Sequence, residues 1–216
     1  IGGPGNLMRP ILAALVLAPA ALAGTYPAFR KSPPVAAQPK PDEAPAPEEG
    51  LDLREVEARA LTGDAEAQYR LGVAYEMGQG VTRSLSTAST WYYKAGSQNH
   101  AKALYRLARI RDREDTGPRA KDYAVSFYTR AAELGDAGAQ FRLGRMYQEG
   151  DGVAKDSAKA ASLFRLAAEQ GDEVAAQRLG LLYYSGQGVP RDYRQAEKWL
   201  KLAFERGQTS AAFHLG

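Results

Sequence analysis

The chain has no cysteine and only two histidines among its 216 residues. Without a thiol, a disulfide framework, a thiolate zinc site, a cysteine nucleophile and a lipid-modified cysteine are all excluded. The histidines, His100 and His214, lack metal-ligand or catalytic-triad spacing. We therefore expect no catalytic residue, no metal site and no cofactor. The net charge of +3 is mild and favours acidic partners only slightly.

Long hydrophobic runs are scarce as well. The apolar run at residues 11–23 is well short of the ~20 residues that cross a bilayer. It follows Met8 and Arg9 and ends in a small-x-small pattern, so we predict a secretory signal peptide at residues 8–23, cleaved after Ala23. Export without stable membrane insertion follows. The residues before Met8 fit no start of a secreted protein, and we interpret them as upstream translation or a fragment boundary.

Large apolar side chains are nearly missing from residues 24–50, which hold prolines among alanines and charged residues. Such a segment buries too little surface to offset its ordering entropy, so we expect an extended, disordered tether. At ~3.1 Å per residue it could reach on the order of 80 Å. A passive spacer is the favoured interpretation, and a proline-motif ligand is the alternative. The prolines are Pro27, Pro33, Pro34, Pro39, Pro41, Pro45 and Pro47.

What the chain does contain is a repeat of 36 residues. A period of this length indicates supersecondary units that bury their apolar faces by stacking on one another. We therefore predict an all-α, right-handed α-solenoid at residues 51–216, with units at 64–99, 100–135, 136–171 and 172–207 and a partial unit at 208–216. The clearest column of the repeat is Leu71, Leu107, Leu143, Leu179 and Leu215.

Each unit is predicted to contain a helix, a glycine turn and a second helix. Asp64, Asp136 and Asp172 are expected to cap the first helices. Residues 51–62 add a preceding helix that can cover the first unit. Glycines also recur with the 36-residue period. Those inside the first helices allow another helix to approach closely. Those in the turns and at the ends of the second helices allow positive φ. They are Gly72, Gly144 and Gly180; Gly78, Gly80, Gly150, Gly152, Gly186 and Gly188; and Gly135, Gly171 and Gly207.

These motifs resemble the Sel-one-like repeat (SLR) family, a relative of the tetratricopeptide α-solenoids. The resemblance rests on residues 65–72, the Gly-x-Gly-Val turns and the Trp-Tyr-x-Lys-Ala run at 91–95, and it covers about residues 64–216. It implies a scaffold that assembles or regulates protein complexes, in the periplasm or envelope for exported bacterial members. Some cysteine-rich relatives are linked to β-lactam binding or hydrolysis; their disulfide-paired helices have no counterpart here, so that activity is not carried over.

The second unit departs from the pattern. Residues 112–118 replace the glycine turn, Arg111 stands in place of a tyrosine, and Asn99-His100 replaces Gly-Asp. Ordinary drift is one interpretation. A locally altered curvature or a binding loop is the other.

The candidate binding residues are arginines and aromatics on the first helices. An arginine precedes the repeated leucine in every full unit, on the side away from the core of its own unit, and units two and three add another arginine three residues on. Arginine beside aromatics is typical of interaction hot spots. Alternatively, the aromatics pack between units and the arginines pair with acids such as Asp156 or Asp192. The candidates are Arg70, Arg106, Arg109, Arg142, Arg145, Arg178, Tyr69, Tyr105 and Phe141.

From these residues we predict a non-catalytic scaffold that binds a protein or peptide along the face of the first helices. Arg106, Arg109, Arg142 and Arg145 would form a two-by-two basic patch on that face. The alternative is binding of an acidic envelope polysaccharide by the arginine column, which salt would weaken steeply. Binding of nucleic acid is not expected. A cell-wall enzyme would require a domain beyond Gly216.

Overall fold

The computed structural model describes residues 52–114 and 120–206, and this part of the chain contains nine α-helices and no strand. The predicted signal peptide (8–23), the tether (24–50) and the partial unit (208–216) lie outside the described residues, as does Gly207. None of the described helices is long and apolar enough to span a membrane. The helices are α2 Leu53–Leu61, α3 Ala65–Met77, α4 Leu85–Ser97, α5 Ala101–Glu114, α6 Ala120–Glu133, α7 Ala137–Glu149, α8 Ser157–Glu169, α9 Glu173–Ser185 and α10 Tyr193–Glu205.

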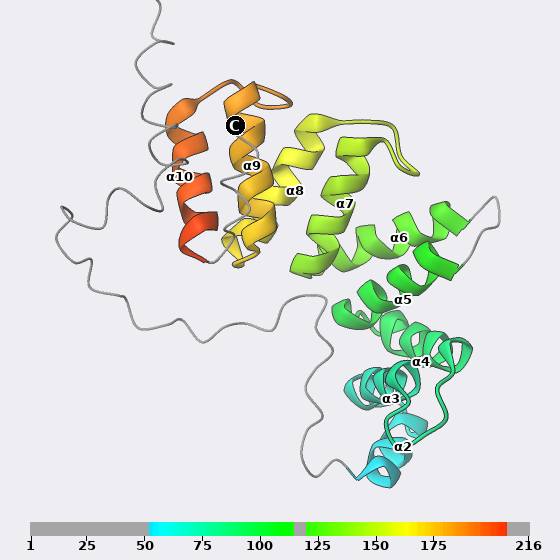
Figure 1. Cartoon of the computed structure of the whole chain (residues 1–216). Helices are drawn as coiled ribbons and strands as arrows, with labels where there is room; N and C mark the ends of the chain where they lie inside the picture. The colour runs from blue at the N-terminus through cyan, green and yellow to red at the C-terminus, as the bar shows by residue number, and fades with distance from the viewer. Residues whose placement is uncertain (1–51, 115–119, 207–216) are drawn as a thin grey trace, which may run out of the picture.

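The helices pack in chain order, as expected for a solenoid of helix pairs. Each helix packs against the helices before and after it, and the closest pairs are α3–α4, α5–α6, α7–α8 and α9–α10. Figure 1 shows the row running from α2 to α10. The short helix α2 covers α3, because Val56 and Ala60 are buried together with Ala67 and Leu71. The predicted all-α solenoid of 36-residue units is therefore confirmed.

The predicted aspartate caps begin the first helices. The carboxylate of Asp64 accepts a hydrogen bond from the backbone N–H of Ala67 at 2.9 Å. Asp136 accepts from the backbone N–H of Ala139 at 2.8 Å, and Asp172 accepts from that of Ala175 at 2.7 Å. Each bond satisfies one of the backbone donors left without a partner at a helix N-terminus. This local chemistry places every first helix at the same point of its unit.

The glycines in the turns adopt the backbone conformation that the sequence predicted. Gly78 ends α3 with φ 74°, and Gly80 follows with φ 71°. The same pair of positive φ values recurs two and three units later. Residues with a Cβ rarely adopt this left-handed region, which explains the choice of glycine at these reversals.

The glycines inside the first helices allow the two helices of a unit to approach closely. A Cβ added to Gly72 would lie 2.6 Å from the Tyr92 ring, and one added to Gly144 would lie 2.8 Å from the Phe164 ring. Tyr92 and Phe164 are fully buried in consequence. Trp91 on α4 is only half-buried, because the neighbouring Tyr92 takes the position that faces α3.

Glutamine side chains connect adjacent units. The Gln68 amide donates to the carbonyl oxygen of Ala60 at 3.1 Å and accepts a hydrogen bond from Gln98 at 2.9 Å. Gln140 and Gln170 repeat the second contact two units later at 2.8 Å. Because Gln68 and Gln140 are buried, these bonds satisfy polar groups that would otherwise be costly inside the molecule.

The Asn99-His100 step preserves the geometry that Gly-Asp has in other units. Asn99 adopts φ 66°, and His100 Nδ1 accepts a hydrogen bond from the backbone N–H of Ala103 at 3.2 Å. Asparagine is among the few residues with a side chain that tolerate this φ. The substitution therefore leaves the joint between the first two units intact. Of the divergent turn, residues 115–118 lie outside the described part of the chain.

Candidate binding surface

The arginine column is divided between the interior and the surface. Arg106 on α5 is buried, with only 4% of its surface exposed, and its Nη1 lies 3.0 Å from Glu76 Oε2 on α3. The Tyr92 hydroxyl donates to the same carboxylate oxygen at 2.6 Å. Arg106, Glu76 and Tyr92 thus form a polar cluster at the boundary between the first two units. The cluster connects two first helices and does not present a guanidinium to a partner.

The other arginines of the column keep more contact with solvent. Arg70 is 2.9 Å from Glu66, and 37% of its side chain is exposed. Arg178 on α9 donates from Nη1 to Gln148 Oε1 on α7 at 3.3 Å. Arg142 is half-buried. The bonds made by Arg106 and Arg178 both reach a residue 30 positions earlier, which shows that consecutive first helices lie side by side.

The second pair of arginines lies one turn further along α5 and α7. Arg145 makes a two-pronged contact with Glu149, 3.0 Å away, and 35% of its side chain is exposed. Arg109 is half-buried, and its guanidinium lies 5.7 Å from the Tyr105 ring centroid. Three further cations of α5 are exposed: Lys102, Arg111 and Arg113.

The aromatic column belongs to the packing between helices. Tyr69 and Tyr105 are buried, and Phe141 is half-buried against the core of units three and four. Each ring contacts the aromatic ring of the second helix in its own unit at about 6 Å, as the pairs Tyr69–Tyr92, Tyr105–Tyr128 and Phe141–Phe164. These ring contacts lie within one unit, but the clusters that hold Tyr69 and Tyr105 also include Ala103 and Ala139 of the following units, and Phe141 packs against the cluster with Ala175. The structure therefore favours the packing alternative for these three side chains.

The predicted two-by-two basic patch is wrong at Arg106, because that side chain is buried in its pair with Glu76. The remaining candidates on the first-helix face are Arg70, Arg109, Arg142, Arg145 and Arg178, all part-exposed. Pairing rules within a single helix do not identify Glu76 and Tyr92 as members of the Arg106 cluster. A signal for Glu76 was present, since acid or amide side chains recur at 76, 112 and 148, always 30 residues before an arginine.

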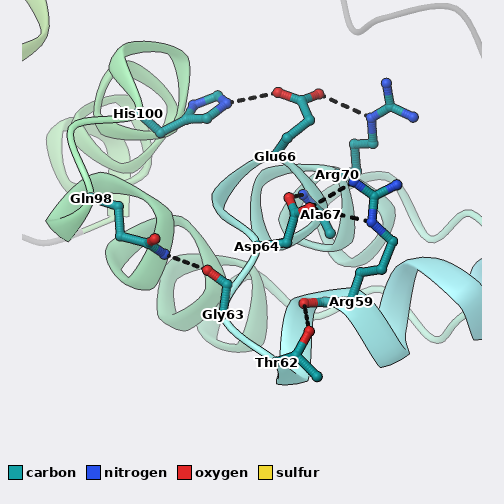
Figure 2. Close-up of polar contacts among 9 residues, drawn as sticks. All are labelled: Arg59, Thr62, Gly63, Asp64, Glu66, Ala67, Arg70, Gln98 and His100. Carbon is teal, nitrogen blue, oxygen red and sulfur yellow. Dashed lines mark hydrogen bonds and ion pairs between the residues drawn. The ribbon is translucent and has the colours of Figure 1, made fainter.

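Figure 2 shows the surface of the first joint, where α2, α3 and the start of α5 meet. The Glu66 carboxylate lies between two cationic or potentially cationic groups, Arg70 at 2.9 Å and His100 Nε2 at 3.0 Å. Below them, Arg59 pairs with the cap Asp64 at 2.6 Å. His100 also stacks on Tyr69 at 4.7 Å between ring centroids. The charged side chains of this network pair with one another and so stabilise the joint.

The electrostatics of the buried cluster keep its arginine charged. Burial by itself would lower the pKa of Arg106, but the oxygens of Tyr92, Tyr69 and Glu76 around it raise that pKa overall. Burial and the Glu76 carboxylate both raise the pKa of Tyr92, so its hydroxyl stays a donor. The cluster therefore contains one cation, one anion and one neutral hydroxyl, a combination suited to structure rather than to proton transfer.

A group of three or more histidine and acidic side chains able to hold a metal ion is not found among residues 52–114 and 120–206. Several carboxylates of this region cap helices or pair with cations, among them Asp64, Asp136 and Glu76. What these side chains offer chemically is charge and hydrogen bonding spread along a row of helices.

A row of helix pairs connected by such joints is the architecture of a repeat scaffold. Comparison with known proteins identifies the family of repeat. The profile of the Sel1 repeat matches residues 65–100, 101–136, 137–172 and 174–208. The chain therefore belongs to the Sel1 repeat family, as its motifs predicted. Proteins of this family are generally protein-interaction scaffolds and typically have no catalytic activity. A search of the curated proteins gave no match.

Solved structures show the same fold. The chain is 37% identical, with a TM-score of 0.69, to a protective antigen of uropathogenic Escherichia coli strains that displays an SLR fold, over 74% of this chain and 34% of that one. A Sel1 repeat protein from Oxalobacter formigenes is 30% identical (TM-score 0.67; 74% and 65% covered). A putative Sel1 repeat protein from Klebsiella pneumoniae is 26% identical (0.50; 72% and 74%). The chain thus spans about a third of the first relative and just under two thirds of the second.

Proposed function

We propose that this chain is an exported, non-catalytic scaffold of the bacterial cell envelope, and that it binds a protein or peptide partner along the face of α3, α5, α7 and α9. The observation that carries the proposal is the row of part-exposed arginines on consecutive first helices. Arg142 and Arg178 come from neighbouring units at the same register position, and Arg145 lies one turn beyond Arg142. Arginine is enriched at the energetically important positions of protein interfaces.

Export is the part of the proposal that depends on the N-terminal sequence. A basic start, an apolar run and a small-x-small end at residues 8–23 are typical of a secretory signal peptide, and a proline-rich tether follows at 24–50. The Escherichia coli relative is described as a protective antigen, which fits a protein that leaves the cytoplasm. We place the mature chain in the periplasm. Edman sequencing of protein secreted by a bacterial host should find Gly24 at the new N-terminus.

The binding proposal is tested by a pull-down from envelope extract with the full chain and with the variant Arg145→Ala plus Arg178→Ala. Both side chains are part-exposed; Arg145 pairs with Glu149 on its own helix, and Arg178 makes a 3.3 Å hydrogen bond to Gln148. We therefore expect loss of the captured partner with a stability change of at most about 1 kcal/mol. Arg194→Ala on α10, also exposed, is the matched control and should capture normally. Equal capture by all three proteins would refute the role of this face.

An acidic polysaccharide is the second candidate partner. It is supported by α5, which carries the exposed cations Lys102, Arg111 and Arg113 in addition to the half-buried Arg109. Polyanion binding depends on many screened charges, so affinity should fall steeply as salt rises and the Debye length shortens to ~8 Å. A protein partner held partly by apolar contacts should respond much less. Titration of the captured ligand at two ionic strengths distinguishes the two.

A further inference from the structure

A pocket of about 470 Å³ lies between the second helices of units three and four, with Tyr183 of α9 also in its lining. Arg165 and Glu169 come from α8, Tyr183 from α9, and Lys198 and Trp199 from α10. None of these residues belongs to the arginine column. The pocket is therefore separate from the surface on which the proposed function depends.

Two cations at this pocket are held over aromatic rings rather than by acids. The Arg165 guanidinium lies 5.9 Å from the Tyr183 ring centroid and also donates a hydrogen bond to the Tyr183 hydroxyl. The Lys198 ammonium lies 5.4 Å from the Trp199 ring. Both side chains are exposed, and within the described part of the chain neither makes an ion pair. Their charges are positioned but not neutralised.

The pair of cations is particular to this place in the array. At the positions that precede Arg165 and Lys198 by 36 residues stand Thr129 and Ser162, and by 72 residues Tyr93 and Ser126. A purely structural requirement of the repeat would place similar residues at every such boundary. The two basic residues together therefore distinguish the boundary between units three and four from the two boundaries before it.

The wall of the same pocket contains a polar group without a partner. Trp199 is only 7% exposed, and its indole Nε1–H has no hydrogen-bond acceptor among the residues that the structure describes. A buried donor of this kind is costly, and most buried polar groups are paired. Because the Nε1 atom is itself covered, Trp199 contributes its ring to the pocket and not a hydrogen bond to a ligand.

We propose that this pocket binds an acidic segment of a partner polypeptide, with a carboxylate side chain held between Arg165 and Lys198 and its chain packed on Tyr183 and Trp199. Charge-assisted hydrogen bonds from guanidinium and ammonium to a carboxylate are stronger than neutral ones. Aromatic walls favour a polypeptide with apolar neighbours beside the acid over a uniformly polar chain.

Two acids also line the pocket, and each has a defined effect. Asp192 is occupied as the cap of α10, accepting from the backbone N–H groups of Arg194 and Gln195 at 2.9 and 3.0 Å. Glu169 is exposed and has no ion-pair partner in the described residues, so it opposes an acidic ligand. Replacing Glu169 by glutamine should therefore tighten binding, a result that a structural role of the pocket does not predict.

The test titrates the ¹⁵N-labelled full chain with a short glutamate–proline peptide and follows the indole N–H resonance of Trp199, assigned against Trp91 with Trp91→Phe. We expect a saturable shift that the matching glutamine–proline peptide does not produce. The variant Arg165→Gln plus Lys198→Gln should raise the Kd at least about tenfold. Glu169→Gln should lower it about twofold to threefold. Lys201→Gln, exposed on α10 outside the pocket, is the control and should leave it unchanged.

Three results would overturn the proposal. One is an absent shift with both peptides, and another is equal binding by the wild type and the double variant. The third is saturation by polygalacturonate without saturation by the peptide, which would assign the pocket to an acidic polysaccharide. If the double variant loses its circular dichroism signal, the Glu169→Gln comparison still decides the question. Because Arg145 and Arg178 are untouched throughout, failure here leaves the proposed first-helix face unaffected.

Discussion

Residues in the same repeat position have different roles according to the neighbour they meet. Arg70 and Arg106 both precede a buried leucine, yet Arg70 pairs with Glu66 at the surface and Arg106 with Glu76 inside. Surface ion pairs contribute little because water and salt screen them. Removing one member of a buried pair leaves an unpaired charge in a poorly solvated place.

The first prediction compares these two arginines. Arg106→Ala should lower the free energy of unfolding on the order of 3 kcal/mol, because Glu76 then loses its buried cation. Arg70→Ala should cost at most about 1 kcal/mol. Urea denaturation followed by circular dichroism measures both. Similar losses in the two variants would contradict the division of the column into interior and surface.

A second prediction concerns the cap aspartates Asp64 and Asp136. The hydrogen bond from Ala67 and the Arg59 side chain lower the pKa of Asp64, whereas burial raises the pKa of Asp136. Asp64 therefore adds stability above its unfolded pKa of about 4 that is lost as pH falls through the folded pKa. For Asp136 the contribution is greatest below about pH 4 and declines as pH rises through the folded pKa. Carboxyl NMR titration should find the two groups on opposite sides of the ordinary value.

At the scale of helices, the first two joints between units match charges across the boundary. The cap position of one unit faces a position near the start of the preceding first helix. His100 contacts Glu66 at 3.0 Å, while burial raises the pKa of Asp136 and the nearby Lys102 cation offsets part of that rise. The histidine that replaces aspartate at position 100 is thus explained by the acid it meets.

The third prediction gives the joint between units one and two the aspartate cap that the next joint has. His100→Asp should keep the cap on α5 but bring a carboxylate against Glu66. In a double-mutant cycle, His100→Asp should be more favourable by about 1 kcal/mol in the Glu66→Lys background than in the native chain. Thermal unfolding of the four proteins measures this coupling. A coupling of zero would show that the two positions do not sense each other.

Much of the helix-level structure could be predicted from the sequence because it depends on local chemistry. The caps at Asp64 and Asp172, the positive φ at Gly78 and the close approach at Gly144 all follow from a residue type at a fixed register. The burial of Arg106 depends instead on a contact 30 residues away on another helix. Pairing rules within one helix cannot find such a contact, so the candidate surface was predicted only in part.

At the scale of the whole molecule, each helix depends mainly on its two neighbours. Stability in such an array is approximately the sum of the units and their boundaries, so it is not uniform along the chain. The helix α2 has nine residues, of which only Val56 and Ala60 are buried, and among the described helices it packs mainly on α3. The inner helices are supported from both sides.

The fourth prediction follows from this arrangement. Amide hydrogen exchange monitored by mass spectrometry should show the fastest exchange in α2 and the slowest in α5–α8, where helices have packed neighbours on both sides. A peptide from α8, such as residues 160–168, serves as the internal reference. Uniform protection from α2 to α8 would mean that the array opens as one cooperative block.

The contact between Arg106 and Glu76 has a consequence for how such a protein can grow. Its two partners lie 30 residues apart, less than one 36-residue unit, and they come from consecutive units. A tandem gene duplication that copies one unit therefore copies both kinds of side chain. The new arginine can pair with the carboxylate of the preceding unit, and the new carboxylate can pair with the arginine of the following unit. Lengthening by duplication therefore needs no new contact between units, because the copied unit already carries the residues that form it.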